Sequence, residues 1–153
     1  MKALYKYITE GYSGAGLIIT FEDEVLFQLR KYPRSWAFIG GGFDKTKDKD
    51  FLDTAIREVF EESGIKINKE DVDKKAIHKL GFGRYKWVLY HASLSKRPTI
   101  NGKKEFSNEY IKYKWVKINN YRFQLNEKEK KHYRLYFFVS YQMKVLQKRL
   151  TFF

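Results

Sequence analysis

No cysteine occurs in this chain of 153 residues. Without thiols there is neither a disulfide nor a thiolate metal site, and a reducing, intracellular compartment is the easier fit. No apolar run approaches the ~20 residues of a membrane span, and the first residues lack the apolar core of a signal peptide. Proline is nearly absent as well, and no low-complexity tract divides the chain. The sequence therefore predicts a cytoplasmic protein that does not span a membrane, with a single domain over residues 1–153.

Acidic residues are scarce relative to basic ones. Asp and Glu number 18 against 31 Lys and Arg, which gives a net charge of +13. Such an excess favours a polyanionic partner, and the mixture of basic with aromatic side chains is typical of surfaces that bind nucleic acid. Alternatively, the excess of basic and aromatic residues reflects a nucleotide bias of the genome that encodes the chain. The basic residues gather in two segments, namely Lys45, Lys47 and Lys49 in one, and Lys128, Lys130, Lys131 and Arg134 in the other.

One acidic segment stands out from this basic background, the stretch 57–65. Ahead of it and within it, apolar residues fall at the i, i+3, i+4, i+7 and i+8 positions of an amphipathic helix, namely Leu52, Ala55, Ile56, Val59 and Phe60. Asp48 or Asp50 suits the N-cap, and Gly64 suits a left-handed stop at the C-terminus. We therefore expect a helix from about Asp50 to Ser63, with the apolar stripe buried.

The opposite face of this helix carries Glu58, Glu61 and Glu62, whose offsets place them close together. Like charges on adjacent turns repel, and the only basic residue among them is Arg57. Carboxylate oxygens are the ligands that Mg²⁺ and Mn²⁺ prefer. The cluster is therefore either a divalent-metal site or a solvated acidic face, and the residues upstream bear on that choice.

Upstream, the aromatic stretch that begins at Trp36 runs into three consecutive glycines, residues 40–42, and a polar turn. Together with residues 57–65 it resembles the signature of the Nudix hydrolases, which reads Gly, five residues, Glu, seven residues, Arg-Glu-apolar-x-Glu-Glu-x-Gly-apolar. The second half matches at every fixed position. In the first half, taking Gly41 as the signature glycine puts Lys47 where the first glutamate belongs, and counting back from the arginine gives Lys49. The loop is longer than the signature, its glutamate is missing, and Asp48 is the nearest substitute.

This resemblance implies a metal site and a reaction. Glu58, Glu61 and Glu62 would bind one to three Mg²⁺ or Mn²⁺ ions, with the backbone carbonyl of Gly41 as a further ligand. Arg57 would orient the carboxylates through an ion pair. The reaction is hydrolysis of a nucleoside diphosphate linked to a group X, in which the ions neutralise the pyrophosphate and activate a water.

Residues outside the acidic helix complete the implied site. Many Nudix relatives add a carboxylate from a loop before a late strand as base or extra ligand, and Glu109 is the candidate here, with a plain surface glutamate as the alternative. Residues 109–115 resemble the Glu-aromatic-x-x-Tyr-x-aromatic pattern of the RNA 5′-pyrophosphohydrolase branch. Gly40 and Gly42 would let the backbone approach the substrate phosphates. Arg30 or Arg34 would reach the phosphates or the base, unless they are solvated loop arginines.

Three functions follow from these observations. The first is a metal-dependent pyrophosphohydrolase that acts on a nucleotide or on an RNA 5′ end. The second is an enzyme for small metabolites such as nucleoside triphosphates, ADP-ribose or dinucleoside polyphosphates. The third is a catalytically weak Nudix-fold protein that binds nucleic acid, for which the missing glutamate and the +13 charge are the motive.

The rest of the chain predicts an α/β fold, a mixed sheet between helices like the Nudix α/β/α sandwich. Apolar alternation predicts strands at residues 4–9, 16–21, 24–30, 37–39, 76–82, 85–93 and 110–116. In the 85–93 strand, Tyr85 and Trp87 either stack a base or fill the core. From about residue 126 to 150 the pattern is helical, with a predicted buried stripe of Tyr133, Tyr136, Phe137, Tyr141, Val145 and Leu146.

Overall fold

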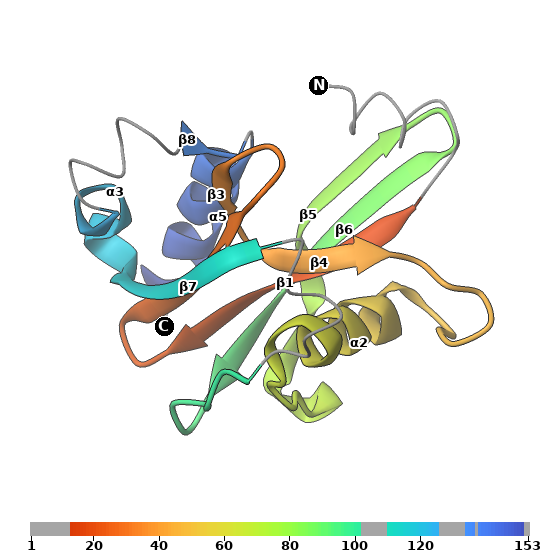
Figure 1. Cartoon of the computed structure of the whole chain (residues 1–153), viewed down its shortest axis with the longest axis horizontal. Coiled ribbons are helices and arrows are strands. Elements are labelled where there is room, and N and C mark those ends of the chain that lie inside the picture. The colour runs from red at the N-terminus through yellow and green to blue at the C-terminus, as the bar shows by residue number, and fades with distance from the viewer. Residues whose placement is uncertain (1–12, 102–109, 126–133, 137, 152–153) are drawn as a thin grey trace.

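The computed structural model describes residues 13–101, 110–125, 134–136 and 138–151. An eight-stranded mixed sheet lies between helix α2 (Phe51–Ser63) and helix α5 (Val139–Thr151), as Figure 1 shows. The strands are β1 (Gly14–Phe21), β2 (Glu24–Arg30), β3 (Ser35–Ala37), β4 (Ile39–Gly42), β5 (Val72–Phe82), β6 (Tyr85–Leu94), β7 (Tyr110–Lys117) and β8 (Arg134–Leu135), and the short helices are η1 (Lys69–Asp71), η3 (Ile118–Asn120) and α3 (Tyr121–Gln124). The predicted α/β/α sandwich is confirmed. The strand expected at residues 4–9 lies outside the described residues.

The central strands bury side chains on both faces of the sheet. In β1, Leu17 belongs to the apolar cluster that contains Val59 of α2, whereas Ile18 belongs to the cluster that contains Met143 of α5. None of these four side chains is more than 1% exposed. A strand covered on both faces needs a continuous apolar run rather than alternation, and β1 has one.

The hairpin of β1 and β2 positions the site, because the two strands stay together only at its closed end. Two residue pairs join them, beside the Glu22-Asp23 turn. Farther from the turn, β1 pairs with β4 and β2 pairs with β3 instead. The other edge of β1 pairs in parallel with β6, and the other edge of β2 pairs with β7, along the length of each strand. Strands β1 and β2 therefore diverge, and segments far apart in the sequence meet around their open end.

Helix α2 has the bounds that the sequence predicted. The side chain of Asp50 accepts a hydrogen bond from a backbone N–H of the first turn, and Gly64 ends the helix in the left-handed region with φ of 73°. Within the predicted stripe Val59 is fully buried, but Phe60 is 38% exposed. Phe60 lies one position past Val59, about 100° farther around the helix, which puts it at the edge of the packed face.

The last helix differs from the prediction. α5 begins at Val139 rather than near residue 126, and residues 134–135 form strand β8 instead. Its buried residues are Val139, Gln142, Met143 and Leu146, in i, i+3, i+4, i+7 spacing. Within the predicted stripe, Leu146 is fully buried and Val145 and Tyr136 pack partly buried against the same core, but Tyr141 is 56% exposed. The predicted stripe residues Tyr133 and Phe137 lie outside the described residues. No helix in the described ranges is long and apolar enough to cross a membrane.

Candidate active site

Arg57 of α2 is the centre of a network of acceptors. Its Nε and Nη2 donate to the two carboxylate oxygens of Asp48, both at 2.8 Å, and Nη2 also donates to the carbonyl oxygen of Gly42 at 2.8 Å. Nη1 donates to Glu58 at 2.8 Å and to Glu61 at 3.1 Å. The expected ion pair between Arg57 and the helix glutamates is present. The same side chain ties α2 to the glycine strand β4.

Asp48 lies in the loop between β4 and α2 and is 6% exposed. Besides Arg57, the backbone N–H of Asp44 donates to it at 2.9 Å and the hydroxyl of Thr54 at 3.0 Å. The hydrogen bonds from Arg57 lower the pKa of Asp48 from 3.8 to about 2, so the carboxylate stays ionised at neutral pH. Asp48 thus joins the loop between β4 and α2 to the helix.

Gly41 faces the carboxylate of Glu58. A Cβ built on Gly41 would lie 2.3 Å from the Glu58 carboxyl carbon and within 2.6 Å of both carboxylate oxygens. Any side chain at position 41 would therefore occupy the space of that carboxylate. This close approach of a backbone and a carboxylate is the physical reason for glycine at this point of β4.

Glu62 has partners in the sheet. Glu62 is only 4% exposed, and its Oε2 accepts a hydrogen bond from Nε2 of Gln28 at 2.6 Å. Its carbonyl oxygen accepts one from the hydroxyl of Tyr113 at 3.2 Å. Glu62 of α2 is therefore held by residues of β2 and β7.

The three helix glutamates consequently divide into two groups, with Glu58 and Glu61 at Arg57 and Glu62 facing the sheet. Within the part of the chain that the structure describes, no group of three His, Cys, Asp or Glu side chains is gathered as a metal site. Glu109 lies outside the described residues.

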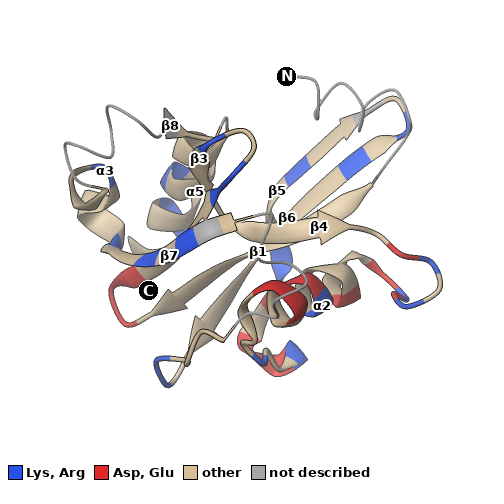
Figure 2. Ribbon diagram, in the orientation of Figure 1, with Lys and Arg blue, Asp and Glu red and all other residues tan. Residues whose placement is uncertain are grey.

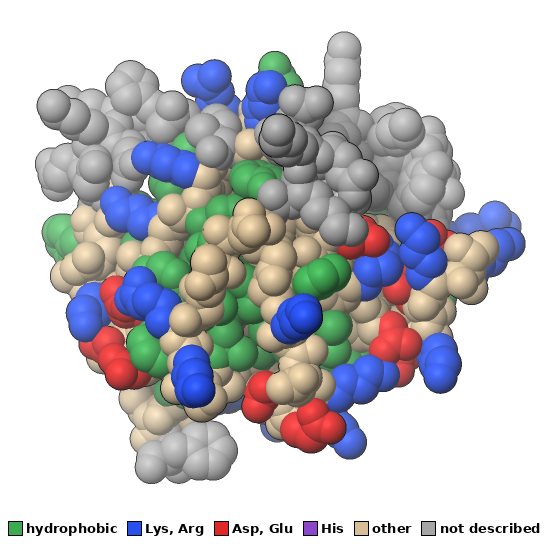
Figure 3. All heavy atoms as spheres, turned by 60° about the horizontal axis from the view of Figure 1, so that its bottom comes forward, with side chains coloured by type: hydrophobic (Ala, Val, Ile, Leu, Met, Phe, Trp, Pro, Cys, Tyr) green, Lys and Arg blue, Asp and Glu red, His purple; other side chains and the backbone are tan. Residues whose placement is uncertain are grey.

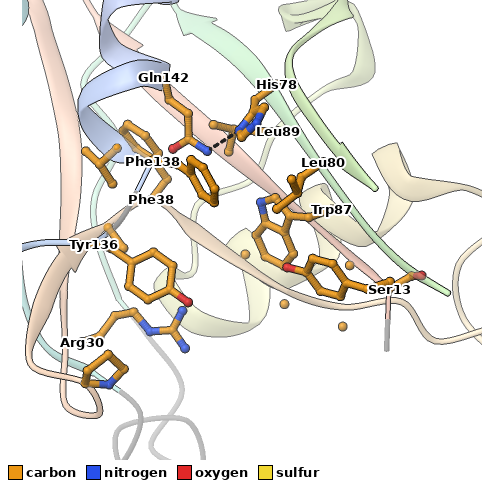
Figure 4. A pocket seen from close by; sticks show the side chains of 18 residues that line it. Ser13, Arg30, Phe38, His78, Leu80, Trp87, Leu89, Tyr136, Phe138 and Gln142 are labelled. Carbon is orange, nitrogen blue, oxygen red and sulfur yellow. Dashed lines mark hydrogen bonds between the residues drawn. The ribbon is translucent and has the colours of Figure 1, made fainter. Parts of the chain in front are cut away.

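A cavity opens on the face of β4 opposite Glu58, lined by segments from residue 13 to residue 142 (Figure 4). Much of its wall is aromatic, from Phe38, Tyr85, Trp87, Tyr136 and Phe138. The glycines at 40, 41 and 42 also line it. One strand of glycines therefore separates the acidic face of α2 from an aromatic cavity.

Three glycines make room for the indole of Trp87. A Cβ at Gly14, Gly16 or Gly40 would lie 2.8, 3.2 or 3.0 Å from an atom of that ring. Gly14 and Gly16 belong to β1 and Gly40 to β4, so the ring reaches from β6 across two neighbouring strands. Trp87 and Tyr85 both line the cavity, as a stacking role requires.

Of the two arginines predicted to meet substrate, the structure brings only Arg30 to the cavity. Its guanidinium carbon lies 5.6 Å from the centroid of the Tyr136 ring. Arg34 is exposed on the turn between β2 and β3. Figure 4 shows Arg30 and Tyr136 at one end of the cavity, and His78 and Gln142 at the other.

The sequence interpretation missed the polar pair at that second end, a buried glutamine and a partly buried histidine. Gln142 is 6% exposed, and its Nε2 lies 2.9 Å from Nδ1 of His78. Burial lowers the pKa of His78, which favours the neutral ring at pH 7. A signal was present, because a glutamine inside an apolar stripe must find a partner when it is buried. Gln28 inside the apolar strand β2 is a second case.

Comparison with known proteins identifies the family. The model of the NUDIX domain matches residues 12–137. A search of curated proteins gave no match. Among solved structures, a C. elegans Ap4A hydrolase in a binary complex is 19% identical, covers 93% of this chain and 99% of its own, and has a TM-score of 0.65. The NUDIX domain of Shewanella oneidensis NrtR complexed with ADP-ribose is 16% identical, covers 97% of both chains and has a TM-score of 0.65. A MutT NUDIX hydrolase from Burkholderia pseudomallei is 16% identical, covers 87% of this chain and 95% of its own, and has a TM-score of 0.62.

At these identities the structural likeness shows the fold, and the match of the domain model along most of the chain shows the ancestry. The chain belongs to the Nudix family. Membership of this family supports a hydrolase that acts on pyrophosphate bonds.

Proposed function

We propose that this protein is a nucleotide pyrophosphohydrolase that uses Mg²⁺ or Mn²⁺ at the acidic face of α2. The observation that carries the proposal is the position of β4. The Glu58 carboxylate lies against one face of Gly41, and the aromatic cavity opens on the other face of the same strand. A pyrophosphate beside these glycines would reach the acidic face while its nucleoside enters the cavity.

The residues at the acidic face suit a hard divalent cation. The proposed donors are all oxygen atoms, from the carboxylates of Glu58, Glu61 and Glu62 and from the carbonyl of Gly41, and Mg²⁺ and Mn²⁺ prefer oxygen. The side chain that Gly41 lacks would fill the space in which the Glu58 carboxylate lies. A bound ion would supply positive charge to the pyrophosphate oxygens and a more acidic water.

The protein's own groups have separate tasks in this proposal. Arg57 orients Glu58 and Glu61 through charge-assisted hydrogen bonds, and Asp48 holds Arg57 from the loop. Arg57 therefore acts through the carboxylates and is a positioning residue. We assign removal of the proton from the attacking water to one of Glu58, Glu61 and Glu109.

The cavity supports a nucleoside as the bound part of the substrate. Its aromatic walls offer faces on which a planar base stacks, a contact worth about 1–3 kcal/mol per base. Arg30 lines one end of the cavity, and a guanidinium suits phosphate charge. Two of the similar solved structures are described with nucleotides, one as an Ap4A hydrolase and one with ADP-ribose bound.

A substrate panel tests the proposal. ATP, ADP-ribose, a dinucleoside polyphosphate and 5′-triphosphorylated RNA are each incubated with Mg²⁺, with Mn²⁺ or with chelator. We expect cleavage of a pyrophosphate bond in at least one nucleotide, loss of cleavage with chelator, and turnover lower by orders of magnitude in Glu61→Gln and Glu62→Gln. Full activity in both variants would refute the site, and a folded protein inactive on the whole panel would favour the nucleic-acid-binding alternative.

An RNA 5′ end is the second candidate substrate, and charge is the observation that favours it. Basic segments lie on the β2–β3 and β5–β6 hairpins, away from the acidic α2 (Figure 2). The turn beside the cavity residue Pro33 carries Lys31 and Arg34, and Arg84 lies at the tip of the other hairpin beside the cavity residue Tyr85. The face in Figure 3, by contrast, mixes both signs of charge around hydrophobic side chains. These positions suit an anionic chain that continues beyond the cavity.

Salt distinguishes RNA from small metabolites. If the hairpins bind a chain of phosphates, triphosphorylated RNA should outcompete ATP at about 0.15 M salt, where long-range attraction is largely screened over about 8 Å. Lys31→Ser with Arg34→Ser should then weaken the RNA reaction and leave the ATP reaction unchanged. Equal competition by ATP at that salt would favour the metabolite enzyme.

A further inference from the structure

Gln28 is a polar residue in the interior of the apolar strand β2. It is 4% exposed, and its neighbours Phe27 and Leu29 are at most 1% exposed. Burial of an amide costs free energy unless its hydrogen-bonding groups are satisfied, so a buried glutamine needs a structural or functional reason. The proposed chemistry above gives Gln28 no role.

The partners of Gln28 supply the reason. Its Nε2 donates to Oε2 of Glu62 at 2.6 Å and to the hydroxyl oxygen of Tyr113 at 3.1 Å, which uses both hydrogens of the amide nitrogen. The Tyr113 hydroxyl in turn donates to the carbonyl oxygen of Glu62 at 3.2 Å.

The arrangement closes a ring of hydrogen bonds around one residue of α2. The side chain of Glu62 is hydrogen-bonded to β2 and its backbone carbonyl to β7, so both the backbone and the carboxylate of Glu62 are held in place. A long acidic side chain otherwise loses rotamer freedom when it binds a ligand, and prior fixation removes that cost. Outer hydrogen-bond partners of metal-binding side chains act in this way.

We infer that Gln28 and Tyr113 are positioning residues that hold the Glu62 carboxylate ready for a divalent cation. This inference rests on the proposed function, because it requires Glu62 to bind the ion. A merely structural role would be to attach α2 to the sheet, and such a role would change stability without changing metal affinity.

The test measures Mn²⁺ affinity by titration calorimetry and the midpoint of thermal unfolding in the same variants. Gln28→Met removes the donor and nearly keeps the volume, and Tyr113→Phe removes only the hydroxyl. Loss of an outer partner of a metal ligand typically costs about 10- to 100-fold in affinity, and we expect Gln28→Met to fall in that range and Tyr113→Phe toward its lower end.

Two variants on the α5 side of the sheet are the controls. Gln147 donates through Nε2 to the carbonyl of Ile118 at 2.8 Å, and Tyr121 is 6% exposed with its hydroxyl oxygen accepting from Arg122 at 3.2 Å. Gln147→Met and Tyr121→Phe remove comparable groups far from Glu62, so Mn²⁺ affinity should stay at the wild-type value. Turnover at subsaturating Mn²⁺ should follow the same order as affinity.

A fifth variant separates the inference from the function on which it rests. If Glu62→Gln leaves Mn²⁺ affinity unchanged, Glu62 does not bind the ion and the metal assignment itself fails. If Glu62→Gln weakens binding while Gln28→Met and Tyr113→Phe bind Mn²⁺ like the wild type, the metal assignment stands and the positioning role is overturned. Tyr113→Phe keeps the second test usable if Gln28→Met does not fold.

Discussion

Glycine at position 41 determines where the Glu58 carboxylate lies, and its neighbour in the same strand offers a matched comparison. A Cβ on Gly41 would fall 2.3 Å from the carboxyl carbon of Glu58, whereas a Cβ on Gly42 would have no heavy atom within 4 Å. One added methyl group must displace a carboxylate, and the other enters open space. The two positions therefore separate the effect of losing a glycine from the effect of moving Glu58.

Gly41→Ala should lower Mn²⁺ affinity and turnover by about 10- to 100-fold, since a misplacement of about 1 Å has that cost. Its folding should survive, because the displaced atoms are the far end of a flexible side chain. Gly42→Ala should keep the wild-type Mn²⁺ affinity. Titration calorimetry with Mn²⁺ and thermal unfolding measure both, and equal affinities in the two variants would contradict the assigned place of Glu58.

At the scale of elements, strand β6 contributes Trp87, an aromatic ring in the wall of the cavity. The Trp87 ring rests over glycines of β1 and β4, so its orientation is set by backbone that has no side chains to adjust. Trp115 of β7 is a matched tryptophan that does not line the cavity and stacks instead with Arg97, 5.0 Å from the ring centroid. The two tryptophans therefore have the same side chain, but only Trp87 lines the cavity.

Trp87→Leu should raise the KM for a nucleotide substrate by about 5- to 150-fold, because a base–aromatic stack worth about 1–3 kcal/mol is lost. Mn²⁺ affinity should not change, since α2 lies on the other face of β4. Trp115→Leu should leave the KM at the wild-type value. Steady-state kinetics at saturating Mn²⁺ give the answer, and a KM that rises equally in both variants would mean that the cavity does not hold the base.

The two long helices show what could be predicted from the sequence. The bounds of α2 were predictable because its capping aspartate, its apolar period and its terminal Gly64 agree with one another. Near α5 no such signals agree, and the predicted stripe included Tyr141, which is exposed. Strand β8 pairs with β3, a tertiary contact that overrides the local helical pattern of the segment.

The same contrast applies within the site. Local spacing was enough to predict the pairing of Arg57 with Glu61, because both belong to one helix. The roles of Gln28 and Gln142 could not be predicted in this way, since each meets a partner at least 34 positions away. Both contacts form when the two long helices pack on the sheet, and no local pattern specifies the partner.

Across the whole molecule, acidic and basic residues lie on different elements and affect stability differently. The net charge of the chain is +13. Many of the acidic residues lie on α2 and the loop before it, whereas basic residues lie on the β2–β3 and β5–β6 hairpins (Figure 2). Charge of one sign repels itself, so the folded state has electrostatic repulsion to overcome at neutral pH. Acidification adds to that repulsion by protonating histidines, and buried histidines resist the proton.

His91 of β6 makes this dependence on pH specific. Its Nε2 lies 2.7 Å from the hydroxyl oxygen of Thr20, and burial lowers its pKa from 6.5 to about 4. The unfolded chain then binds the proton more readily than the folded one, so the stability that neutral His91 permits is complete above pH 6.5 and is lost as the pH falls toward 4. The loss is at most about 3 kcal/mol for a shift of this size. Nearby Asp73 raises this pKa and Arg149 lowers it, and burial outweighs both.

His91→Gln keeps a polar group for Thr20 and removes the titration, so its free energy of unfolding should fall less than that of the wild type between pH 6.5 and pH 4. Chemical denaturation at half-unit steps of pH measures both slopes. Asp48 does not affect this comparison. Its pKa falls from 3.8 to about 2, so its contribution to the free energy of unfolding is lost only below about pH 4. If the variant and the wild type lost equal stability over the upper range, the acid sensitivity would belong to other groups, and the buried ring of His91 would be protonated without cost.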